Sequence, residues 1–250
     1  MVRKKGQVTI FIIFGLIIVV GLMIVFFLFN PPEIRIVDES NPQGFIESCT
    51  RQATEEAIDF LSKRGGDITP TGYVSYEGED IKYLCYTKRF YEKCVNQRPL
   101  LVEHIEDQIT DHITPIVADC FFDLRKGLEN RYEIEESEMK ITTRLHPGEV
   151  SVKIDKNFKM VRSGEVIDFN QFRMTMVHPI YNFAKISMDI VNQEITFCNF
   201  DELGFNIIHQ EYDVRKFITG NSDIIYTVKD LGTEEQFEFA ISSCRLPAGF

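Results

Sequence analysis

The sequence predicts an α+β protein: an N-terminal transmembrane helix followed by an extracytoplasmic domain of amphipathic helices and antiparallel β-meanders. Three observations support this class. One hydrophobic segment opens the chain. Hydrophobic residues then recur at spacings of three and four, as they do along one face of a helix. From residue 140 onward they alternate with polar residues, which is typical of strands with one buried face. Helices followed by a run of strands indicate an α+β arrangement.

The composition restricts the possible functions. The chain has 250 residues, enough for one large or two small domains, and its 44% hydrophobic content and 21 Phe can fill a packed core. After residue 29 it carries 24 Lys and Arg against 38 Asp and Glu. This excess of acid disfavours a nucleic-acid partner, because affinity for nucleic acid depends on basic side chains that displace counterions from phosphates. The composition also excludes collagen-like, low-complexity and disordered chains.

Residues 8–29 predict the transmembrane helix. Of these 22 residues, 19 are Ile, Leu, Val, Phe or Met, and none is charged. A helix of this length spans about 33 Å, close to the hydrocarbon thickness of a bilayer, so membrane lipid is an expected partner. Three basic residues precede the segment, and basic flanks remain on the cytoplasmic side. Residues 1–7 are therefore expected to form a cytoplasmic tip, and residues 30–250 are expected to lie outside the cell.

The basic tip also carries a family resemblance. The run Arg3-Lys4-Lys5-Gly6-Gln7-Val8-Thr9 resembles the class III signal peptide of archaeal type IV pilin-like proteins. The resemblance implies that a prepilin peptidase cuts between Gly6 and Gln7 and leaves the hydrophobic helix on the mature protein. Thr9 stands where the family usually has Ser. Phe11 stands where the family has a Glu that is tied to filament assembly.

A second resemblance lies further along the chain. The run Phe45-Ile46-Glu47-Ser48-Cys49, together with the later Gly65-Gly66, resembles uncharacterised single-span surface proteins of small-genome archaea. This resemblance implies a place at the cell surface and no particular activity.

The first part of the outer domain is predicted to be helical, with one hairpin. Residues 30–44 form a polar, proline-containing linker, and residues 45–130 follow as the helical and hairpin part. An amphipathic helix over 45–64 is expected to end at Gly65-Gly66 in a left-handed cap. A hairpin over 72–87 turns near Gly78.

A second helix in this part carries a hydrophobic stripe from Leu101 to Leu124. Thr114-Pro115 interrupts it and predicts either a kink or a new helix N-terminus, because proline is favoured at the first helical position.

Residues 131–250 are predicted to be the antiparallel, β-rich part. One hairpin turns at Pro147-Gly148, a pair that suits a type II turn, and another turns at Ser163-Gly164. A helix is expected over 179–194. Three further strands follow, separated by turns near Gly220 and Gly232. The sequence leaves open whether the two parts share one core.

Six cysteines all fall on the predicted outer side of the membrane. An even number in an oxidising compartment favours three disulfides, although many pairings are possible. We expect Cys49 to pair with Cys120, because both lie on hydrophobic helix faces. Cys85 would then pair with Cys94, and Cys198 with Cys244. Free buried thiols are the alternative, whereas a zinc site is disfavoured because the chain has no CxxC motif.

The helix after residue 101 holds the residues that could bind a metal: His104 and His112, with Asp107 and Asp111 beside them. Imidazole and carboxylate groups on one face suit a divalent ion. The same spacing also arises on any solvated helix face opposite a hydrophobic one, and no HExxH motif is present. We therefore predict no metal and no cofactor, with these four residues as candidates for the alternative.

The predicted function is that of a membrane-anchored cell-surface protein. Its disulfide-stapled extracellular head would serve binding, adhesion or envelope structure, with a protein partner at the cell surface. No nucleophile elbow, P-loop or dinucleotide fingerprint occurs, so the sequence does not predict an enzyme. One alternative is a pilin-like subunit processed at Gly6 and assembled into a filament. Another is an extracellular metal-dependent enzyme that uses His104 and His112.

Overall fold

The computed structural model describes residue 13, residues 15–21 and residues 41–245, in two compact units that divide after Val37. In the first unit, residue 13 and residues 15–21 are helical. Most of the predicted transmembrane segment and the whole processing site, Gly6 and Gln7, lie outside the described residues. Among the helices that are described, none combines the length and the hydrophobicity needed to cross a bilayer.

The second unit has the predicted α+β composition. Its elements, in chain order, are α2 (Pro42–Lys63), β1 (Tyr73–Tyr76), β2 (Glu79–Tyr86), β3 (Val95–Asn96), α3 (Leu101–Leu128), β4 (Glu133–Glu136), β5 (Lys140–His146), β6 (Glu149–Arg162), β7 (Glu165–Val177), α4 (Ile180–Phe197), α5 (Glu202–Ile208), β8 (Tyr212–Ile218), β9 (Ile224–Asp230) and β10 (Gln236–Ser242).

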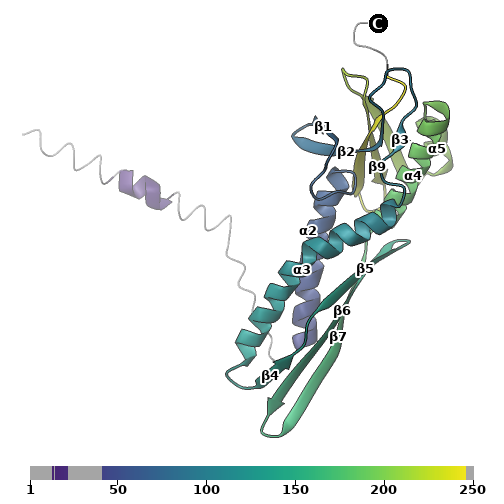
Figure 1. Cartoon of the computed structure of the whole chain (residues 1–250). Coiled ribbons are helices and arrows are strands. Elements are labelled where there is room, and N and C mark those ends of the chain that lie inside the picture. The colour runs from purple at the N-terminus through teal and green to yellow at the C-terminus, as the bar shows by residue number, and fades with distance from the viewer. Residues whose placement is uncertain (1–12, 14, 22–40, 246–250) are drawn as a thin grey trace, which may run out of the picture. The chain divides into compact units, whose positions relative to one another are not determined.

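These strands form two sheets. The first has the order β1-β2-β10-β9-β8, with β3 also paired to β2. Its β2–β10 pair is parallel, and the other described strand pairs are antiparallel. In the second sheet, β6 lies between β7 on one side and β4 and β5 on the other. Figure 1 shows the two sheets toward opposite ends of the unit, and α2 contacts both of them through β7 and β10.

The start of α2 corrects the predicted linker. The helix begins at Pro42, so the last three residues of the expected 30–44 linker are helical. The cause is local: the Asn41 side chain accepts a hydrogen bond of 2.9 Å from the Gly44 amide, and Pro42 already has the backbone angle of a first helical residue. The predicted glycine cap is confirmed, since Gly65 has φ +64° and the Gly66 amide donates to the Leu61 carbonyl at 2.9 Å.

Pro115 does not begin a new helix. The structure has a single α3 from Leu101 to Leu128 with Pro115 inside it, so the N-terminus considered at this residue is wrong. Figure 1 shows α3 changing direction along its length, as expected where proline removes one backbone hydrogen bond. The helix continues because its buried stripe stays in phase on both sides, with Ile113 before the proline and Val117 after it fully buried.

The predicted hairpins are present. Gly148 has φ +74°, which fits the expected Pro-Gly turn between β5 and β6. Ser163 and Gly164 both have positive φ, 52° and 86°, as a two-residue type I′ turn between β6 and β7 requires. The predicted helix over 179–194 is present as α4, which ends at Phe197. The short elements α5, β3 and β4 were not predicted.

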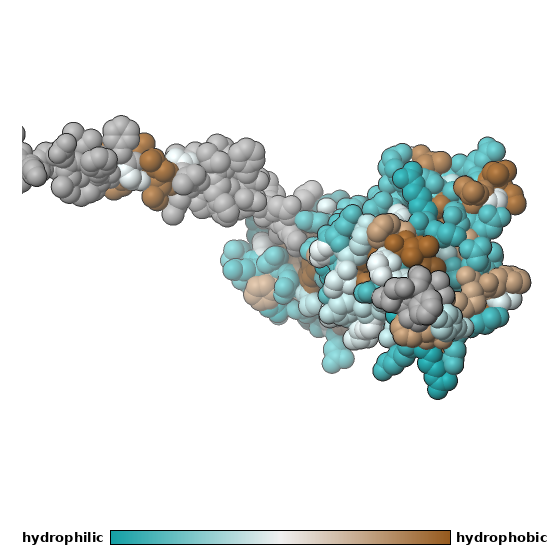
Figure 2. All heavy atoms as spheres, turned by 90° about the horizontal axis from the view of Figure 1, so that it is seen from above, coloured by the Kyte–Doolittle hydropathy of each residue, from teal (hydrophilic) through white to brown (hydrophobic). Residues whose placement is uncertain are grey.

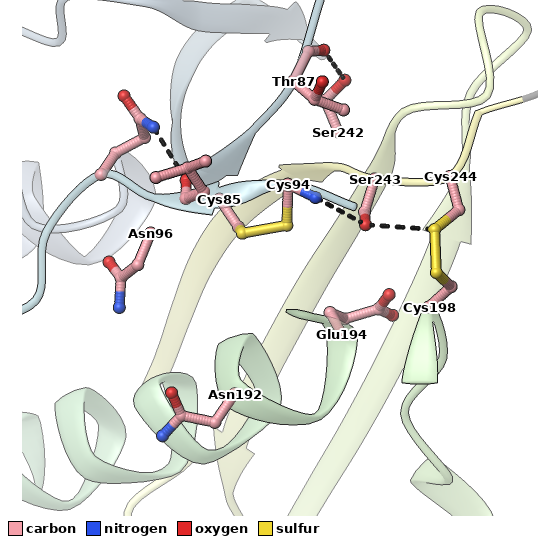
Figure 3. Close-up of a disulfide and its surroundings, with 12 residues drawn as sticks. Cys85, Thr87, Cys94, Asn96, Asn192, Glu194, Cys198, Ser242, Ser243 and Cys244 are labelled. Atoms are coloured by element: carbon pink, nitrogen blue, oxygen red, sulfur yellow. Dashed lines mark hydrogen bonds between the residues drawn. A yellow bond between two sulfur atoms is a disulfide. The ribbon is translucent and has the colours of Figure 1, made fainter. Parts of the chain in front are cut away.

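The cysteines form the three expected pairs: Cys49–Cys120, Cys85–Cys94 and Cys198–Cys244, with Cα–Cα distances of 6.5, 5.4 and 5.9 Å. The first joins α2 to α3, and the last joins the end of α4 to the residues after β10. Figure 3 shows the Cys85–Cys94 and Cys198–Cys244 disulfides on either side of Ser243. The Ser243 hydroxyl accepts a hydrogen bond of 3.2 Å from the Cys94 amide. Three disulfides fit a domain that is stabilised for an oxidising, extracellular environment.

Candidate ligand pocket

Three charged or polar side chains from other segments of the head surround the carboxylate of Asp67, in the loop after α2. Asp67 is 3% exposed. Its carboxylate accepts two hydrogen bonds from the Arg98 guanidinium, at 2.9 and 3.3 Å, and lies 2.6 Å from Nε2 of His104. The ammonium of Lys82, which is also buried, lies 3.7 Å away. We call these four residues the Asp67 cluster.

Close packing of the loop against β2 creates the cluster. Gly65 and Gly66 turn the chain out of α2 with positive φ, which brings the next residue, Asp67, over the strand. A Cβ added at Gly65 would lie 2.8 Å from Cβ of Lys82, so a larger residue would push the loop away from β2. Two glycines at the helix exit are therefore what allows Asp67 and Lys82 to meet.

The partners of Asp67 set its protonation state. Burial raises the pKa of the Asp67 carboxyl, but hydrogen bonds from His104 and Arg98 more than offset burial and hold this pKa below its ordinary value. Burial and the nearby Arg98 lower the pKa of Lys82. Asp67 raises this pKa again, but only in part. At neutral pH the cluster therefore contains an ionised carboxylate shared between two cations and a histidine.

A pocket of about 270 Å³ adjoins the cluster at Lys82. We call it the tyrosine–lysine pocket, and its lining residues are Thr71, Gly72, Tyr73, Lys82, Tyr83, Tyr86, Lys88 and Gln97. The rings of Tyr83 and Tyr86 lie 4.9 Å apart. Lys82 forms part of the wall, and its ammonium donates a hydrogen bond to the Thr71 carbonyl. The pocket thus combines aromatic rings with the buried positive charge of Lys82 and the exposed positive charge of Lys88.

A second pocket, of about 320 Å³, lies on the sheet formed by β5, β6 and β7. Its basic residues are Arg144, Lys153 and Arg173. Acidic side chains engage two of them: Arg144 donates to Glu106 at 2.8 Å, and Lys153 donates to Asp155 at 2.9 Å. These pairs reduce the positive charge that the second pocket can offer to a ligand.

The residues considered for a metal are not brought together. His104 contacts Asp67, whereas the ring of His112 lies 6.1 Å from that of Phe60. Asp107 and Asp111 are exposed on α3. Among the residues that the structure describes, no group of three or more His, Cys, Asp or Glu side chains could hold a metal ion.

Sequence reasoning missed three members of the Asp67 cluster. Arg98 lies 31 residues after Asp67, and His104 lies 37 residues after it, so no local spacing connects them. His104 was noticed, but for its neighbours along α3 and not for its partner across the fold. Comparisons with known protein families, curated proteins and solved structures find no match, so the geometry alone characterises this site.

The surface also carries exposed hydrophobic side chains on α5. Leu203, Ile207 and Ile208, here called the α5 patch, are 72%, 73% and 76% exposed. No residue of α5 is buried. Figure 2 shows hydrophobic residues at the surface on the side where α5 lies in Figure 1. Exposed hydrophobic residues that gather on one element are a common feature of protein contact sites.

Proposed function

We propose that the chain is a membrane-anchored cell-surface protein whose head, residues 41–245, acts by binding. The carrying observation is that all six cysteines are paired, since disulfides persist in oxidising compartments and are rare in the cytosol. The uncharged hydrophobic segment 8–29 and its basic flank support an anchor with the head outside. The tyrosine–lysine pocket and the α5 patch support binding.

Labelling in intact cells tests this placement. Lys126 is exposed on α3, and Val2 belongs to the expected cytoplasmic tip. A membrane-impermeant maleimide should label Lys126→Cys and leave Val2→Cys unlabelled until the cells are broken. The wild-type chain should react only after reduction. Labelling of Val2→Cys with protection of Lys126→Cys would contradict the proposed orientation, and free thiols in the wild-type chain would contradict the location.

The motif at Gly6 and Gln7 favours a second candidate, a pilin-like subunit that assembles into a filament. Mass spectrometry of the protein from its own membranes should then find a mature chain that begins at Gln7. Gly6→Leu should block this processing, and filaments should be visible by electron microscopy. An intact N-terminus without filaments would leave the anchored head as the function. No contact among the described residues favours the third candidate, a metal-dependent enzyme.

A further inference from the structure

We propose that the tyrosine–lysine pocket binds a small anion, a six-membered ring that carries a carboxylate. This inference deepens the proposed binding function and names the ligand class of one site. It depends on the charges around the pocket, on the fixed position of Lys82 and on the aromatic wall.

The charge of the pocket has the opposite sign to that of the whole chain. The formal net charge of the chain is −11, yet the described lining residues of this pocket include two lysines and no acid. Behind the wall, the carboxylate of Asp67 faces both Lys82 and Arg98. One negative charge therefore neutralises one of two cations, and Lys88 adds another at the pocket. The carboxylate of Asp223, next to the lining residue Tyr83, is already paired with Arg245 at 3.5 Å. A surplus of positive charge in a concave site favours an anionic ligand.

Lys82 is held in place before any ligand arrives. Its ammonium donates to the Thr71 carbonyl and lies 3.4 Å from the Thr71 hydroxyl. A Cβ added at Gly72 would lie 3.9 Å from Lys82 Nζ, so this glycine adds no side chain of its own beside the ammonium. A charge that is already ordered loses little conformational entropy on binding, which favours affinity.

The aromatic wall suits a ring. Tyr73 is 45% exposed and Tyr83 is 8% exposed, so the pocket offers both an accessible ring and a buried one. Aromatic faces pack on flat rings and on the CH faces of sugars alike. The volume of about 270 Å³ lies just below the range of about 300–1,000 Å³ that is usual for small-molecule sites, so it suits one substituted ring.

The β5–β6–β7 pocket is the weaker site for such a ligand. Two of its three basic side chains already contact carboxylates, and its lining contains no aromatic residue among those described. A carboxylate ligand would have to compete with Glu106 and Asp155 there.

Calorimetry on the full-length protein in a non-ionic detergent tests the proposal with four probes. Glucuronate and benzoate carry the carboxylate on a sugar ring and on an aromatic ring. Glucose and benzyl alcohol are the neutral counterparts. We expect at least one carboxylate to bind, more weakly as salt is raised, and its neutral counterpart to bind at least about tenfold less tightly. Which carboxylate binds distinguishes a sugar ligand from an aromatic one.

Variants locate the binding. Lys88→Gln removes an exposed charge that contacts no residue of the Asp67 cluster, and it should weaken binding by about tenfold. Lys126→Gln removes the same charge at the far end of α3 and should change nothing. Tyr73→Ala should weaken binding, whereas Tyr73→Phe keeps the ring and should retain it.

Three results would overturn the proposal: no binding of either carboxylate up to about 10 mM, equal binding of the neutral probes, or equal loss in both lysine variants. None of these depends on cellular location, so a failure here is distinguishable from a failure of the labelling experiment above.

Discussion

Two buried carboxylates, Asp67 and Glu194, sit in opposite electrostatic surroundings. Both are almost fully shielded from solvent, at 3% and 1% exposure. Asp67 faces Lys82, Arg98 and His104. Glu194, near the end of α4, accepts a hydrogen bond from the Tyr226 hydroxyl, and its second oxygen has no hydrogen-bond partner in the described part of the chain.

The two carboxylates are similarly buried, so their neighbours decide why their pKa values shift in opposite directions. Burial raises the pKa of Glu194, and the hydrogen bond from Tyr226 offsets only part of this rise. The pKa of Asp67 is lowered despite burial. Hydrogen bonds and cations thus shift Asp67, beside a pocket, toward its ionised form, whereas burial shifts the pKa of Glu194 upward. Four experiments can break or sharpen this contrast.

The largest effect is expected from Asp67→Ala. The substitution leaves buried Lys82 without a counter-charge, which should lower the free energy of unfolding by about 3 to 5 kcal/mol. Urea unfolding at pH 7 measures the loss. Asp80→Ala is the matched control, because Asp80 accepts a hydrogen bond from the Ser75 hydroxyl at a more exposed position. This substitution should lower the free energy of unfolding by about 1 kcal/mol or less. Equal losses would show that Asp67 is not a special counter-charge.

Stability measured as pH falls should differ in its response to Asp67 and to Glu194. His178 also contributes to the loss of stability in acid. Burial lowers the pKa of His178 to about 4, and its Nδ1 accepts the Ile180 amide at 3.1 Å. Asp59 opposes this lowering, and Glu235 lies 3.9 Å away. A lowered folded-state pKa contributes stability above the unfolded value, which is lost as pH falls toward 4. The loss from His178 is about 3 kcal/mol.

His178→Asn keeps an acceptor for the Ile180 amide and removes the titration. Its stability should therefore fall less steeply between pH 6.5 and 4 than that of the wild type. The acid loss that persists in this variant is expected to come from carboxylates such as Asp67. If the free energy of unfolding of this variant fell with pH as steeply as that of the wild type, His178 would not be neutral in the folded protein.

Tyr226→Phe tests the single hydrogen bond that Glu194 receives. Without the hydroxyl, Oε1 of Glu194 loses its buried donor, and we expect a loss of about 2 kcal/mol at pH 7. Tyr212→Phe removes the hydroxyl bonded to Asn182 at a less buried site and should cost less. If the two variants were equally stable, the Glu194–Tyr226 hydrogen bond would stabilise the fold no more than the one between Asn182 and Tyr212.

The smallest effect, and one of opposite sign, is expected from Glu194→Gln. A raised folded-state pKa contributes stability below the unfolded value, and this stability is lost as pH rises through the folded value. Gln keeps the acceptor for Tyr226 and cannot ionise. The variant should match the wild type at pH 4 and exceed its stability by about 1 kcal/mol at pH 8. A variant that is less stable than the wild type at pH 8 would contradict a raised pKa of Glu194.

The parts of the fold that sequence predicts are those that depend on near neighbours. Hydrophobic spacing located α2 and α3, and turn chemistry at Pro147-Gly148 and Ser163-Gly164 located two hairpins. Pro115 predicted either a kink or a new helix N-terminus, and the sequence could not choose between them because the burial that carries α3 past the proline is tertiary. The short α5 has only seven residues and no buried stripe, so it left no periodic signal.

The site depends on contacts between distant segments. The spacing of His104 and His112 makes His104 a candidate metal ligand, but in the structure its partner is Asp67 in the loop after α2. The parallel pairing of β2 with β10 joins segments more than 150 residues apart, and no residue pattern in either strand specifies it. Cysteine pairing was predictable because Cys49 and Cys120 lie on hydrophobic helix faces that must meet.

The position of β10 has a consequence for how the head is made. This strand lies between β2 and β9, although it is the last in sequence of the strands that the structure describes. The first sheet therefore cannot be completed until synthesis has passed Ser242, because β10 joins β2 to β9. Cys85 and Cys94, nine residues apart, can join early, whereas Cys198 must wait for Cys244, 46 residues later. A chain that stopped before Gln236 would lack β10 and would leave β2 and β9 without the strand that joins them.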